Sequence, residues 1–140
     1  MLQQTQVDRV VEKYGEFIKA FPTIQSLARA PLPKLLRIWS GLGYNRRALY
    51  LQKTAQAIVS KHRGIFPQDV SELERLPGVG PYTARAVSVF AFHQPQVVLE
   101  TNIRRVFIHT FFPHARDIED EALLPLIKRT LYVQDPHMWY

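Results

Sequence analysis

The sequence contains no cysteine. This absence excludes disulfide bonds, thiolate metal sites, a cysteine nucleophile and an iron–sulfur cluster held by cysteines of this chain. No apolar run approaches the roughly 18 residues that a membrane-spanning helix needs. The first residues, Met1–Gln4, lack the basic and apolar regions of a secretory signal peptide. We therefore expect a cytoplasmic protein with no membrane partner.

Acidic residues are also few, because 12 Asp and Glu stand against 18 Lys and Arg and leave a net charge of +6. A positive surface favours anionic partners such as nucleic acid. The basic residues form pairs, such as Arg46-Arg47 and Arg104-Arg105, rather than the long run of a disordered basic arm. Together with 46% hydrophobic residues, this indicates one packed domain over residues 1–140 with several phosphate contacts.

Apolar residues recur at helical spacing through almost the whole chain, as at Val7, Val10, Val11 and Tyr14. Comparable patterns predict helices within residues 7–21, 32–39, 45–64, 69–76, 82–92, 103–111 and 122–131. The segment 82–92 is apolar on nearly every face, which predicts a helix buried in the centre of the fold. Only residues 97–99 look strand-like, and they are too few to build a sheet. The predicted class is an all-α bundle of about seven to nine helices.

The two ends of the sequence predict incomplete helices. Asp135-Pro136 has the chemistry of a helix start, an N-cap carboxylate followed by proline at the first helical position, yet the chain stops soon afterwards at Tyr140. The apolar pattern is already present at Met1-Leu2, with no capping residue before it. We expect residues 1–140 to be a piece of a longer chain that lacks helices at both ends.

The strongest local signal is Pro77-Gly78-Val79-Gly80-Pro81 between two predicted helices. Two glycines allow positive φ and close backbone approach, and the first N–H groups of the following helix point outward with the positive end of its dipole. Such a turn binds a phosphate without reading a base. The alternative is an ordinary helix–loop–helix connection, which is the commoner meaning of Pro-Gly-x-Gly by itself.

The surrounding segments decide between these readings, because they resemble the helix-hairpin-helix (HhH-GPD) DNA glycosylases of the endonuclease III superfamily. The resemblance is greatest to the A/G-specific adenine DNA glycosylases (MutY-type). It rests on ordered motifs that cover most of the chain: Met1–Val7, Trp39–Tyr44 with Arg47-Ala48, Gly64 with Phe66-Pro67, Leu73 to Ala84, and Leu99–Val106.

The resemblance implies a helical barrel with the hairpin, about residues 73–85, at the mouth of a cleft. It also implies binding to double-stranded DNA that contains a mismatch or a damaged base, with one nucleotide rotated out of the stack. Gln4 is then the residue that inserts beside the vacated position, although a polar residue at a helix start is its plainer reading. The other implied DNA contacts, each of which has solvated surface or packing as an alternative, are Gly78, Val79, Gly80, Thr83, Arg47, Arg85, Arg104 and Arg105.

Cleavage of an N-glycosidic bond calls for an acid at the leaving base and a carboxylate facing the sugar. Glu100 stands where the family has aspartate. The glutamate side chain is one methylene longer than that of aspartate and keeps the negative charge. The resemblance assigns it to the sugar, with Asn102 orienting it or a phosphate; the alternative for Glu100 is an N-capping carboxylate. The family's proton donor is a glutamate two residues before the motif that begins here at Met1, so we expect residues 1–140 alone to bind DNA and excise poorly.

Tyr82 stands where the lyase branch of the superfamily carries a nucleophilic lysine, and no lysine lies between Lys61 and Lys128. The resemblance therefore implies a monofunctional, water-using glycosylase with Tyr82 near the extruded nucleotide; packing against the hairpin is the alternative. The five histidines lack metal-ligand spacing, so we expect no metal or other cofactor, although related hairpins can hold a monovalent cation through main-chain carbonyls. We expect a monomer that is cytoplasmic and associated with the nucleoid.

Three functions remain open at this stage. The first is excision of adenine opposite guanine or oxidised guanine. The second is excision of thymine from a G·T mismatch, which Tyr82 and the hairpin fit equally well. The third is a DNA-binding module without catalysis, in which Glu100 is only a helix cap.

Overall fold

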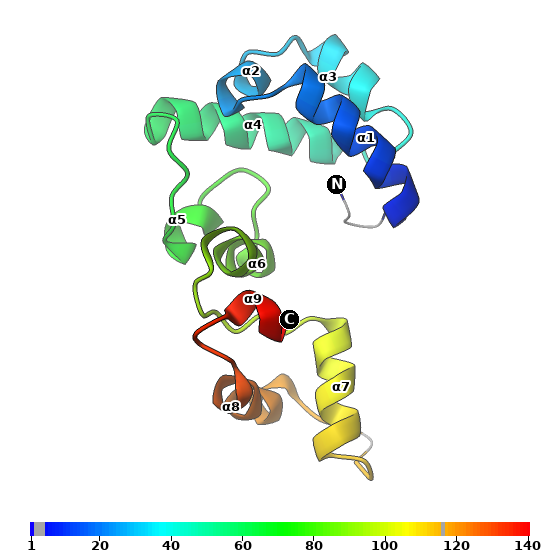
Figure 1. Cartoon of the computed structure of the whole chain (residues 1–140), viewed down its shortest axis with the longest axis vertical. Helices are drawn as coiled ribbons and strands as arrows, with labels where there is room; N and C mark the ends of the chain where they lie inside the picture. Colours follow the sequence, from blue (N-terminus) through cyan, green and yellow to red (C-terminus); the bar gives the residue numbers. More distant parts are fainter. Residues whose placement is uncertain (2–4, 116) are drawn as a thin grey trace. The chain divides into compact units, whose positions relative to one another are not determined.

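In the computed structural model, which describes residues 1, 5–115 and 117–140, all regular secondary structure is helical (Figure 1). The described residues form nine helices, which confirms the all-α prediction, and residues 97–99 form no strand. The helices divide into two compact units. The first unit comprises Met1–Pro67 and Arg75–Gly78, and the second comprises Gln68–Glu74 and Val79–Tyr140.

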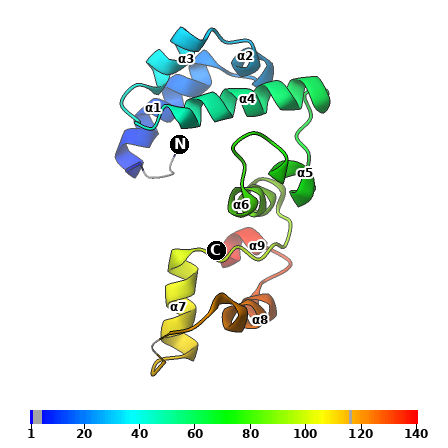
Figure 2. The same cartoon turned by 180° about the vertical axis from the view of Figure 1, so that it is seen from behind.

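The first unit contains α1 (Val7–Ala20), α2 (Ile24–Ala28), α3 (Leu32–Trp39) and α4 (Arg46–Lys61). Both α2 and α3 pack against α4, and α1 packs against α3 (Figures 1 and 2). Asn45 precedes α4 as predicted, but its side chain makes no capping hydrogen bond. The long helix α4 is therefore the element on which the first unit is assembled.

Aromatic side chains fix α1 against α3. The Phe17 ring lies 5.1 Å from that of Phe21 and 6.1 Å from that of Trp39, both edge-on. Such pairs contribute about 0.5–1.5 kcal/mol each beyond their burial. Trp39 is 1% exposed, and its indole N–H donates to the Gly43 carbonyl at 3.1 Å. The core thereby also fixes the loop that leads into α4.

Helix α2 was not among the predicted elements. Its five residues are too few for an apolar period to show, and a reciprocal capping box between Thr23 and Ser26 sets its start. At the other end, the buried Gln52 amide of α4 donates to the carbonyls of Leu27, at 3.3 Å, and Ala30, at 2.7 Å. The Leu27 carbonyl also accepts from the Ala30 N–H at 3.2 Å, so the glutamine adds a second bond there and ties the residues after α2 to α4.

The second unit contains α5 (Val70–Glu74), α6 (Pro81–Phe92), α7 (Thr101–Phe111), α8 (Asp120–Thr130) and α9 (Pro136–Trp139). Helix α6 packs against α5 and α9, and α7 packs against α8 (Figures 1 and 2). The second unit therefore contains two packed groups of helices: α5, α6 and α9 form one, and α7 and α8 form the other.

The core of this unit lies between α7 and α8, where Phe107, Leu123 and Ile127 are buried together. The predicted central burial of α6 is wrong in this unit: its buried residues include Ala84 and Val89, but the Phe90 side chain is 47% exposed. Phe90 instead makes edge contacts with the rings of α9 and its neighbour, His137 and Tyr140. A short final helix covers less of α6 than the apolar sequence pattern suggests.

Tyr140 ties the end of the chain to the segment before α7. Its hydroxyl donates to the Gln96 carbonyl at 2.8 Å and accepts from the Val98 N–H at 2.6 Å. Among the described helices, none is both long and apolar enough to cross a membrane.

Candidate functional site

The hairpin turn, residues 75–80, joins α5 to α6 and is the segment predicted to bind a phosphate. Gly78 has φ +78°, a conformation that glycine adopts without strain. Gly80 is the N-cap of α6, Pro81 follows at the first helical position, and no side chain caps this end. The first N–H groups of α6 are therefore left for solvent or for an anion, which the helix dipole favours there.

Helix α4 holds this turn. The Thr54 hydroxyl, on a residue 8% exposed, donates to the Pro77 carbonyl at 2.7 Å. A Cβ placed on Gly78 would lie 2.6 Å from both Cβ and Cγ of Tyr50, so the turn backbone lies directly against that side chain. Leu76 is 4% exposed and anchors the turn from within. The backbone conformation at Pro77 and Gly78 is thus set by contacts from α4.

Glu100 is the N-cap of α7. Its Oε1 accepts a hydrogen bond from the Ile103 N–H at 3.0 Å, and the residue is half-buried. The capping alternative raised by the sequence is therefore observed. A capping carboxylate oxygen has a second oxygen beside it, so this geometry is compatible with either role for Glu100. Asn102 lies exposed in the first turn of the same helix.

The residues predicted to touch DNA along α6 lie in or near its first turn. Tyr82 is 51% exposed, so it does not pack fully against the hairpin. Thr83 and Val79 are half-buried and Arg85 is exposed. An exposed aromatic ring beside uncapped N–H groups is suited to contact a nucleotide, and these residues remain predicted DNA contacts.

With this geometry established, comparison with known proteins identifies the family. Residues 1–128 match the family described as HhH-GPD superfamily base excision DNA repair protein. The chain belongs to this family. It is 46% identical over 124 residues to an adenine DNA glycosylase of Buchnera aphidicola subsp. Baizongia pistaciae, covering 89% of this chain and 35% of that protein.

Further relatives agree with this placement. The HhH-GPD chain is 44% identical over 106 residues to an adenine DNA glycosylase of Mycobacterium tuberculosis, covering 76% of this chain and 35% of that protein. It is 42% identical over 107 residues to the adenine DNA glycosylase of Homo sapiens, covering 76% of this chain and 20% of that protein. The chain thus spans about a third or less of the length of these relatives.

Solved structures share the fold. The HhH-GPD chain superposes on a thermostable thymine-DNA glycosylase with a TM-score of 0.82 at 22% identity, covering 97% of this chain and 64% of the other. It superposes on endonuclease III, trapped as a covalent intermediate with DNA, with a TM-score of 0.78 at 25% identity, covering 97% and 66%. The helix-hairpin-helix fold predicted from the sequence is therefore confirmed.

Arg47 and Arg104, two of the predicted phosphate contacts of this HhH-GPD chain, bind other parts of the protein. The Arg47 guanidinium donates to the carbonyls of Met1 and Leu42, each at 2.8 Å, and lies over the Trp39 ring at 5.5 Å. It links the start of the chain to the loop before α4. No finding tests whether it also contacts DNA, so that role stays a prediction.

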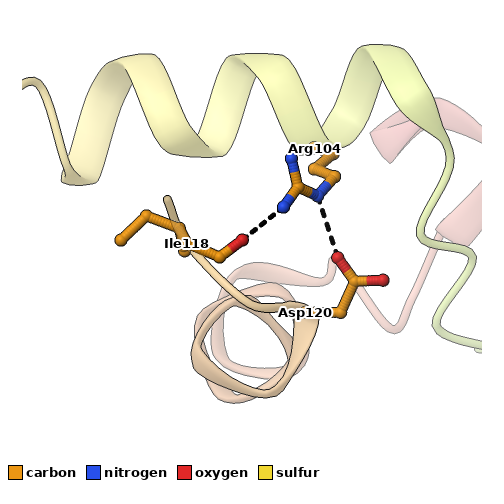
Figure 3. Close-up of polar contacts among 3 residues, drawn as sticks. All are labelled: Arg104, Ile118 and Asp120. Carbon is orange, nitrogen blue, oxygen red and sulfur yellow. Dashed lines mark hydrogen bonds and ion pairs between the residues drawn. The ribbon is translucent and has the colours of Figure 1, made fainter. Parts of the chain in front are cut away.

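Arg104 ties α7 to the first residue of α8 and to the segment before it. Its Nε lies 2.9 Å from the Asp120 carboxylate, and its Nη2 donates to the Ile118 carbonyl (Figure 3). The neighbouring Arg105 is exposed. Gln4, the predicted wedge, lies outside the described residues.

Three residues of α4 that bear on the hairpin were not predicted as site residues. These are Arg46, Tyr50 and Thr54. The i, i+4 spacing of Arg46 and Tyr50 on a helix predicts that the two side chains meet, and this signal could have drawn attention to them. No feature of the sequence relates Thr54 to Pro77, because that contact spans 23 positions and depends on how α4 packs.

Proposed function

We propose that this chain is part of a monofunctional DNA glycosylase that removes adenine mispaired with guanine or oxidised guanine. The substrate class rests on the relatives at 42–46% identity, which are named adenine DNA glycosylases. The observation that carries DNA binding is the uncapped, glycine-initiated start of α6, whose turn is braced by α4.

In this proposal the hairpin binds one strand through main-chain N–H groups at the positive end of α6, a contact that reads charge and not sequence. The target nucleotide leaves the stack, at a cost of a few kcal/mol. The protein then needs no metal to cleave the bond. Positive charge develops on the sugar as the bond to adenine breaks, and the Glu100 carboxylate stabilises that charge.

The absence of a hairpin lysine determines the course of the reaction. With Tyr82 at the position of the lyase nucleophile, no amine at this turn can form a Schiff base with the sugar. Adenine takes up a proton as it leaves, and water adds to the sugar carbon and gives up a proton. The product is an abasic strand whose phosphodiester backbone is uncleaved.

The capping bond of Glu100 favours a second candidate, a DNA-binding module without catalysis, because capping alone accounts for a carboxylate at this position. The two candidates differ in excision and not in binding.

A panel of single-lesion duplexes separates them. The full-length product of the gene is incubated in excess with duplexes carrying adenine opposite guanine, adenine opposite oxidised guanine, or thymine opposite guanine. Release of adenine without strand cleavage supports the proposal. Release of thymine alone would assign the G·T substrate, and tight binding without release of any base would assign the module.

A further inference from the structure

Arg46 and Tyr50 form a pair on the exposed side of the first turns of α4. The Arg46 Nη2 lies 3.3 Å from the Tyr50 hydroxyl, and its Cζ lies 5.7 Å from the centre of the ring. Arg46 is exposed and Tyr50 is 37% exposed. The guanidinium therefore donates to the tyrosine hydroxyl and lies over its ring, on a residue that is exposed.

The same tyrosine contacts the hairpin turn. Its Cβ and Cγ are the atoms that a Cβ on Gly78 would meet at 2.6 Å. Thr54, one turn further along α4, donates to Pro77 and fixes the turn at this place. One tyrosine side chain thus separates the Arg46 guanidinium from the backbone of the hairpin turn.

The chemistry of the pair suits a phosphodiester. A guanidinium has five N–H donors in a planar fork, and the hydrogen bond to the Tyr50 hydroxyl uses one of them, which leaves the others for a phosphate. Neither ion pair in the described part of the chain, Lys13 with Glu16 or Arg104 with Asp120, involves Arg46. Arg47 is different, because its donors already bind protein carbonyls.

We propose that Arg46 binds a backbone phosphate of the DNA strand held by the hairpin turn, with Tyr50 as the positioning residue. This inference rests on the proposed DNA-binding function and adds a contact outside the hairpin itself. Arg46 then contributes charge and Tyr50 places that charge beside Gly78. Neither residue reads a base, so the contact is expected on any sequence.

The test measures the salt dependence of binding to a fluorescent duplex for the wild type, Arg46→Gln and the control Arg29→Gln. Arg29 is an exposed arginine at the end of α2, so its variant loses the same charge. Loss of one phosphate contact lowers the slope of log K against log salt by about 0.9. Between 50 and 200 mM salt, the wild type should lose about 3.5-fold more affinity than Arg46→Gln. Arg29→Gln should keep the wild-type slope, and Arg46→Lys should restore it.

The role of Tyr50 is tested in the same assay by a double-mutant cycle. In a Tyr50→Leu background, Arg46→Gln should change the slope less than it does in the wild type, because the guanidinium has already lost its support. Equal effects in the two backgrounds would refute the positioning role.

The same measurements separate DNA binding by the hairpin from the phosphate contact at Arg46. A wild-type chain whose affinity does not depend on salt would overturn hairpin-mediated DNA binding altogether. A salt-dependent wild type with equal slopes for Arg46→Gln and Arg29→Gln would overturn only the phosphate contact at Arg46.

Discussion

Replacement of Gly78 by alanine tests how the hairpin turn is held. The new methyl group meets two separate obstacles. At φ +78°, an L side chain is strained, which costs roughly 1–2 kcal/mol. The methyl would also lie 2.6 Å from Cβ and Cγ of Tyr50, atoms that are near the helix backbone and cannot move aside freely. Overpacking of this kind costs about 1–3 kcal/mol.

The combined effect is a loss of about 2–5 kcal/mol in the free energy of unfolding. Gly80→Ala is the matched control, because Gly80 has φ −92° and a Cβ there meets nothing within 4 Å. That substitution should change the free energy of unfolding by less than about 1 kcal/mol, because the reduced freedom of the unfolded chain opposes the poorer N-cap preference of alanine.

Urea unfolding followed by far-ultraviolet circular dichroism measures both variants. Combining Gly78→Ala with Tyr50→Gly removes both clashing atoms, Cβ and Cγ, and leaves the strained φ, so the double variant should show coupling of about 1 kcal/mol or more. The reasoning would be refuted if Gly78→Ala unfolded at the same urea concentration as Gly80→Ala, or if the two substitutions were simply additive.

Two further predictions concern single hydrogen bonds. Thr54→Val leaves the Pro77 carbonyl without its donor and should lower the unfolding free energy by about 1–2 kcal/mol, whereas Thr54→Ser keeps the hydroxyl and should recover most of it; equal losses in urea unfolding would contradict this. Burial raises the pKa of Tyr140 above its ordinary value, against the opposing effect of the bond from the Val98 N–H. Folding therefore favours the neutral phenol. The stability that the neutral phenol contributes is fully present below about pH 10, the ordinary pKa of tyrosine, and is lost as pH rises through the raised pKa. The melting temperature of the wild type should fall more between pH 9 and about pH 11 than that of Tyr140→Phe, and parallel curves would count against it.

Much of the fold is predictable from the sequence because long amphipathic helices impose an apolar period. Helix α1 shows this, since the inward positions Val10 and Phe17 follow from spacing and Pro22 marks its end. Helix α2 was missed because a five-residue helix depends on a local capping box and on a buried glutamine from α4. The burial of α6 was overestimated because composition does not reveal how little of it a short partner helix covers.

In the candidate site, too, some features could be predicted from the sequence and others could not. The hairpin could be predicted because a turn with positive φ favours glycine, as at Gly78. Arginine roles could not be predicted, because Arg46 and Arg47 are adjacent in sequence but lie in different surroundings. Arg47 points to carbonyls of its own unit, whereas Arg46 is exposed over Tyr50. Which arginine meets solvent is decided by the helix face, and neighbouring residues on a helix occupy different faces.

The most direct test of the account is the single-turnover release of adenine by the full-length gene product and its Glu100→Gln variant. The duplex carries adenine opposite oxidised guanine. Glutamine keeps an oxygen that can accept the Ile103 N–H, so the cap of α7 persists while the negative charge is lost. We predict a rate at least about 100-fold lower for the variant, with unchanged affinity for the duplex. Equal rates for the two proteins would contradict the assignment of Glu100 to the reaction.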